Sequence, residues 1–108
     1  MARLIRPDGE VEVVRPRGQR WTLQELQQHV GGYIELTPWL ALPRFVLNET
    51  AALERRPVNA VATALHSEAL AKNLRCSVED LPGEVGKRLW YLPQLRGNVL
   101  VLDEDERM

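Results

Sequence analysis

Residues 22–37 read TLQELQQHVGGYIELT, and this stretch decides the fold because it places a helix with both ends marked directly before a strand. Thr22 and Glu25 have the spacing of a capping box, in which each side chain bonds the backbone of the other at a helix start. Gly31 ends the helix, because glycine accepts the left-handed conformation of a C-terminal cap. The apolar residues of this helix share one face: Leu23, Leu26 and Val30.

The residues on either side of this helix extend the pattern. Trp21 precedes the cap, where it can pack onto the helix as a hydrophobic staple. Residues 33–37 alternate like a strand, with Ile34 and Leu36 pointing inward. Residues 44–48 (RFVLN) predict the returning strand, so a hairpin follows the helix.

The N-terminal residues predict another hairpin. Residues 2–6 form a short apolar-leaning run, and Pro-Asp-Gly at 7–9 is a turn signal. Val11 and Val13 then alternate with glutamates, which is the period of a half-buried strand.

A second helix is predicted to start at Pro57 and Asn59. Its first apolar face holds Val58, Val61, Ala62, Leu65 and Ala69. Leu70 and Leu74 fall on a different face. Either the helix breaks near residues 67–69, or it carries a second apolar strip for another surface.

The last apolar run is residues 98–102 (NVLVL), which predicts an interior strand covered on both faces. The fold class is therefore α+β, in the order β-β-α-β-β-α-β, with two main helices packed on a mostly antiparallel sheet. We expect a single domain over residues 1–102, in which 66–96 form a longer irregular or helical insertion. Residues 103–108 are an acidic tail.

Composition narrows the function classes. The 108 residues carry a net charge of −1, so no general electrostatic attraction to nucleic acid or anionic membranes is expected. Cys76 is the single cysteine, which excludes an internal disulfide and fits a reducing compartment. The N-terminus has no apolar run of the signal-peptide kind. These features predict a protein of the bacterial cytoplasm without a membrane segment.

Several blocks resemble a family of small uncharacterised proteins of bacteriophages, plasmids and other mobile elements. The family pattern is LQxxVGGYIE, NEE, LPxNxxAT and a terminal GxxxV strand. The matching blocks here are LQELQQHVGGYIE at 23–35, VLNE at 46–49, RPVN at 56–59, Ala62-Thr63 and RGNVLV at 96–101. Two blocks depart from the pattern, since Thr50 follows Asn48-Glu49 and Arg56 begins the LPxN block. The resemblance implies a mobile-element origin and a compact α+β domain, and it brings no established activity.

No pattern of residues predicts catalysis. His29, His66 and Cys76 are too scattered for a zinc site, which takes four ligands in close pairs. Gly31-Gly32 lacks the rest of a phosphate-binding loop. No nucleophile, base and orienting group occur together, so we expect neither an enzyme nor a cofactor.

The candidate binding residues are polar side chains at element ends and the exposed aromatics. Asn48 and Asn59 either cap backbone groups or line a small polar pocket at the hairpin rim. Arg17 and Arg20 beside Trp21 could clamp a nucleotide or single strand, although nucleic acid is not the expected partner. Trp39 lies between prolines and is the tryptophan most expected at an interface. The complete candidate set is Tyr33, Glu35, Asn48, Asn59, Thr63, Arg17, Arg20 and Trp39.

The sequence therefore predicts a non-enzymatic accessory protein of a phage or mobile element that binds a host protein or a second copy of itself. The alternative is a small-molecule binder, such as a sponge for a nucleotide.

Overall fold

The structure is a computed structural model that describes residues 1–36, 44–80 and 94–103. Within these residues five strands form one antiparallel sheet in the order β2-β1-β5-β4-β3. The predicted order of elements and the α+β class are confirmed. The elements are β1 (Ala2–Ile5), β2 (Val11–Val14), α1 (Leu23–Val30), β3 (Ile34–Leu36), β4 (Arg44–Asn48), α2 (Ala60–Leu74) and β5 (Val99–Leu102).

Helix α1 begins and ends as its sequence predicts. The Thr22 side chain accepts from the Glu25 backbone N–H at 3.2 Å, and the Glu25 carboxylate accepts from the Thr22 backbone, which completes the capping box. Gly31 caps the other end in the left-handed conformation, with φ of 78°. Trp21 is buried beside this helix, and its ring meets His29 edge-on.

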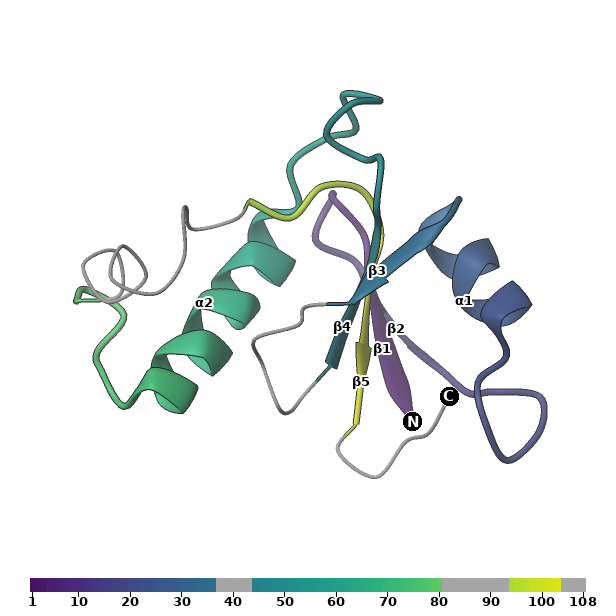
Figure 1. The fold of residues 1–108 in the computed structure, drawn as a ribbon, viewed down its shortest axis with the longest axis horizontal. Coiled ribbons are helices and arrows are strands. Elements are labelled where there is room, and N and C mark those ends of the chain that lie inside the picture. The colour runs from purple at the N-terminus through teal and green to yellow at the C-terminus, as the bar shows by residue number, and fades with distance from the viewer. Residues whose placement is uncertain (37–43, 81–93, 104–108) are drawn as a thin grey trace.

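Each face of the sheet carries one helix, and Figure 1 shows the sheet nearly edge-on between them, with α2 on the left and α1 on the right. Two apolar clusters fill the two interfaces. The cluster under α1 contains Ala2, Leu4, Trp21, Leu26, Val30, Val46, Leu100 and Leu102. The cluster under α2 contains Ile5, Phe45, Ala62, Leu70, Ala71, Leu95, Val99 and Val101. Strand β5 lies between both clusters and is buried along its whole length, which confirms the predicted interior strand.

The predicted burial of β2 is wrong. Val11 and Val13 are 53% and 61% exposed. Their partners on β1 are Ile5 and Arg3, so both valines lie on the same face of the sheet as α2. The helix does not extend over them. Strand β2 is the outermost strand, and the cluster under α2 takes its sheet residues from β1, β5 and β4. A period of two identifies a strand but cannot show whether a helix lies over it.

Helix α2 runs unbroken through residues 67–69, so the predicted break is wrong. The predicted second apolar strip for another surface is wrong as well, because Leu70 and Leu74 pack into the same cluster as Ala62. Asn59 caps its start, and Arg75 ends it with φ of 57°. The predicted apolar face is partly wrong, because Val58 and Val61 are exposed. The buried positions are Ala62, His66, Leu70 and Ala71. Among the described residues no helix has the length and hydropathy to span a bilayer.

Candidate functional site

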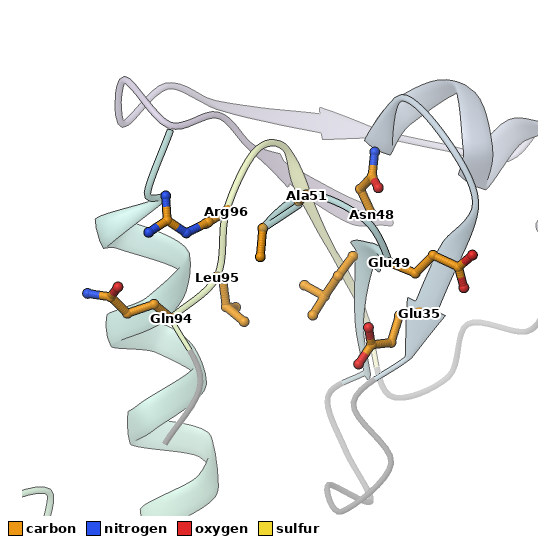
Figure 2. Close-up of a pocket in the computed structure, with 9 residues that line it drawn as sticks. Glu35, Asn48, Glu49, Ala51, Gln94, Leu95 and Arg96 are labelled. Carbon is orange, nitrogen blue, oxygen red and sulfur yellow. The ribbon is translucent and has the colours of Figure 1, made fainter. Parts of the chain in front are cut away.

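A cavity of about 220 Å³ opens beside β3 and β4 on the face of the sheet that carries α2. Figure 2 shows its walls, which come from the β3–β4 hairpin, the turn after β4 and the segment that enters β5. The described lining residues are Glu35, Leu47, Asn48, Glu49, Ala51, Ala52, Gln94, Leu95 and Arg96.

The inner wall of the cavity is apolar. Leu95 and Ala51 are 2% and 5% exposed, and Leu47 packs against the cluster under α2. Glu35 lies opposite Leu47 in the β3–β4 register, so both side chains lie on the cavity face of the sheet. Glutamate at this position places a carboxylate at the rim of an apolar hollow.

The charged and amide side chains at the rim point in different directions. Figure 2 shows the Glu35 carboxylate turned toward the side where Leu95 lies, whereas Glu49 points the opposite way. The Arg96 side chain extends away from Ala51, and its guanidinium donates to the Arg56 carbonyl at 3.1 Å. Glu35 is therefore the charged side chain, among the described lining residues, that faces the apolar wall.

Two predicted site residues hold that wall in place without lining the cavity. The Asn59 backbone N–H donates to the Leu95 carbonyl at 2.8 Å. The Leu95 N–H donates to the Thr63 hydroxyl at 2.9 Å. Both polar groups of the Leu95 backbone are thus bonded to the start of α2, which fixes the side chain of Leu95 against the cavity.

Both candidate asparagines bond backbone groups, as one of the two sequence interpretations predicts, and Asn48 also lines the cavity, as the other predicts. Asn59 is fully buried, and its amide donates to the carbonyls of Ile5 and Gly97, both at 2.9 Å, while its oxygen caps α2. Asn48 is among the lining residues, and Figure 2 shows its side chain pointing away from Leu95. Its amide donates to the last carbonyl of α1, that of Val30, at 3.2 Å, and its oxygen accepts from the turn residue Thr50.

Arg56 connects the cavity rim to the end of α1, and sequence reasoning did not single it out. Its guanidinium donates to the carbonyls of Val30 and Gly31 at 3.3 and 3.0 Å. It also pairs with Glu54 at 2.7 Å. Hydrogen bonds from Thr50 and then Arg56 lower the pKa of Glu54. Arg56 is the first residue of the RPVN block at 56–59, which is one of the blocks that carry the family resemblance. Its place in that block is the sequence feature that could have identified it.

The remaining candidates lie apart from the cavity. Tyr33 is 70% exposed and does not line it. Arg17 and Arg20 are exposed, but Trp21 is buried, so the proposed clamp lacks its aromatic ring. The backbone N–H of Arg17 instead donates to Glu25, which is the main cause of the lowered pKa of that carboxyl. Trp39 lies outside the described residues.

The histidines and the cysteine are separated. His29 stacks edge-on with Trp21, His66 is buried under α2, and Cys76 is half-buried beyond the end of that helix. Within the described ranges no three His, Cys, Asp or Glu side chains are grouped so that they could hold a metal ion.

Comparison of the chain with protein-family models, with curated proteins and with solved structures found no significant match in any of the three. The resemblance to the mobile-element family therefore stays a prediction that rests on its sequence blocks.

Proposed function

We propose that this protein acts by binding, and that the cavity receives a basic side chain of a partner protein. The single observation that carries the proposal is one carboxylate, that of Glu35, at the rim of a hollow walled by Leu47, Ala51 and Leu95. A lysine or arginine side chain combines an apolar stem with a cationic end. The stem fits the leucine and alanine wall, and the cation fits the carboxylate.

The size of the cavity favours a side chain over a nucleotide. Pockets for drug-sized ligands span roughly 300 to 1,000 Å³, whereas this cavity has about 220 Å³. The inward carboxylate of Glu35 would also repel a phosphate, and the Arg96 guanidinium that could attract one extends away from the cavity. The nucleotide-sponge alternative is therefore the weaker one.

Binding also suits the chemistry of the lining residues better than turnover does. A carboxylate against apolar walls holds a cation, whereas catalysis needs a second acid, base or nucleophile beside it. The described lining residues place no such group next to Glu35. Together with the resemblance to mobile-element proteins, this supports an accessory protein of a phage or mobile element that recognises a host protein.

The test uses a short peptide with one central lysine and an analogue in which norleucine replaces the lysine. Norleucine keeps the apolar stem and lacks the charge. In amide NMR spectra we expect the lysine peptide to shift the signals of Glu35, Leu47 and Leu95, and the analogue to shift them much less. Glu35→Gln should abolish the difference, while the matched control Glu49→Gln, whose carboxylate points away from Leu95, should keep it.

The same two variants test the partner. Wild-type protein and the Glu49→Gln control should retain a common protein from a bacterial lysate that Glu35→Gln does not retain. A partner held equally by all three would place recognition elsewhere on the molecule. Equal shifts with both peptides would show that Glu35 does not select a cation.

A further inference from the structure

Strand β2 forms one edge of the sheet, and its register shows which backbone groups face outward. The Arg6 N–H donates to the Glu10 carbonyl and the Arg6 carbonyl accepts from the Gly9 N–H, both at 2.9 Å, so the backbone groups of Arg6 face the second strand at the end of the hairpin. Pairs alternate along an antiparallel ladder. Glu12 and Val14 therefore bond to β1, and Val11 and Val13 direct their N–H and C=O groups away from it. Among the described strands none pairs with this outer side.

The side chains of this edge also suit an interface. Val11 and Val13 are more than half exposed, and both lie on the face that carries α2. Val61 of α2, itself 39% exposed, lies near the hairpin, since a Cβ on Gly9 would be 3.9 Å from its methyl group. Natural edge strands are usually protected by charged side chains, especially lysine, by proline or by a bulge. Residues 11–14 (VEVV) carry one charged side chain, that of Glu12, and neither lysine nor proline.

We propose that a second copy of this chain covers this edge, and that the two β2 strands pair antiparallel about a two-fold axis centred on Val13. The two five-stranded sheets then become one continuous sheet. The proposal is independent of the cavity, which lies beside β3 and β4 at the opposite edge.

The charges and the short extent of β2 together select this register. Outward groups must face outward groups, which allows the axis to pass through any residue from Val11 to Arg15. An axis at Glu12 places two glutamates opposite each other, and an axis at Val11 places Glu12 opposite Glu10. An axis at Arg15 opposes two arginines and brings Pro16 into the ladder. An axis at Val14 brings Pro16 opposite Glu12 and leaves Val14 as the only residue of β2 that pairs within β2. Like charges that face each other across strands are destabilising.

The axis at Val13 avoids every one of these conflicts. It places Val13 opposite its own copy, Glu12 opposite Val14, and Val11 opposite Arg15. A chain that is complementary to itself in one register fits a two-fold dimer, in which the same patch serves both subunits. This self-complementarity is why the occupant is a second copy rather than an unrelated strand.

Sedimentation equilibrium over a range of concentrations tests the assembly. Wild-type protein should dimerise, and Val13→Pro should weaken dimerisation about tenfold or more, because it removes one hydrogen bond from each side of the axis. The Val13 N–H makes no bond to β1, so the monomer should keep its fold by circular dichroism. Val13→Lys should also dissociate the dimer through like charges at the axis. Leu53→Lys, at a site that is 85% exposed, is the matched control and should dimerise like wild type.

Cysteine cross-linking in a Cys76→Ser background tests the register. Directly opposed residues of a hydrogen-bonded pair have Cα atoms about 5.5 Å apart, which a disulfide spans. Val13→Cys should therefore cross-link to itself with oxidised glutathione. The two copies of Val11→Cys would be about 13 Å apart along the strands and should not cross-link. A monomer at all concentrations, a dimer unaffected by Val13→Pro, or cross-linking through Val11→Cys instead of Val13→Cys would each overturn the proposal.

Discussion

The buried histidine of α2 makes the stability of this protein depend on pH. His66 is fully buried, and its ring meets Phe45 edge-on with 5.2 Å between ring centroids. Burial disfavours the charged imidazolium and lowers the pKa of His66 from 6.5 to about 4. The folded protein therefore keeps His66 neutral at pH values where the unfolded chain already binds a proton.

The direction of the effect follows from this difference in proton binding. Above pH 6.5, the value for the unfolded chain, neither state holds the proton and the full stability is present. As the pH falls from 6.5 toward 4, the unfolded state alone gains a proton and the free energy of unfolding decreases. At about 1.4 kcal/mol for each pH unit, the loss over this window is about 3 kcal/mol.

Urea unfolding at intervals from about pH 7.5 to about pH 4.5 measures this loss. Carboxyls with lowered pKa values, such as those of Glu25 and Glu54, also lose stabilising charge in acid. The pH dependence of wild type is therefore compared with that of His66→Leu, whose side chain fills the site and cannot bind a proton. As the pH falls, we expect the free energy of unfolding of wild type to decrease more than that of His66→Leu, by somewhat less than about 3 kcal/mol. Parallel curves would show that His66 binds its proton equally in both states.

Three further substitutions test the contacts that set the fold and the cavity. Asn59→Ala removes the cap of α2 and leaves the buried carbonyls of Ile5 and Gly97 without their amide donor, and urea unfolding should show a loss of about 3 kcal/mol. Thr22→Ala should cost about 1 kcal/mol in the same assay, because it removes one half of the capping box of α1. Gly97→Ala should lower the melting temperature, since Gly97 has φ of 72° and an added Cβ would lie 3.1 Å from the Arg56 side chain.

Local chemistry made most of the fold predictable. The spacing of Thr22 and Glu25 and the position of Gly31 define α1 through contacts within a few residues. The apolar run of β5 likewise predicts a strand that is covered on both faces, as the structure shows. The exposure of Val11 was not predictable, because it depends on how far α2 extends over the sheet. The prediction of the apolar face of α2 was partly wrong for the same reason, because Val61 lies at the end of the helix near the hairpin.

The candidate site was only partly predictable because its parts meet through distant contacts. Glu35 was singled out as a polar position within the block at 23–35 that carries the family resemblance, and it does line the cavity. Thr63 was also singled out, but its role depends on Leu95, which lies 32 residues later in the chain. The sequence gives no local reason to place residues 94–96 beside the β3–β4 hairpin. The sequence therefore did not predict the apolar wall that faces the Glu35 carboxylate.

The cavity and the β2 edge, taken together, predict how the protein would engage a partner. They lie at opposite edges of the sheet, so a dimer through β2 presents one open cavity at each end. A partner with two basic side chains at a matching separation would bind with avidity, which can exceed the single-site affinity by about 10² or more. Val13→Pro should remove that gain for a two-lysine ligand and leave the affinity for a one-lysine peptide unchanged. Isothermal titration calorimetry with both ligands measures the two affinities. An equal weakening of both by Val13→Pro would mean that the β2 edge and the cavity belong to one site.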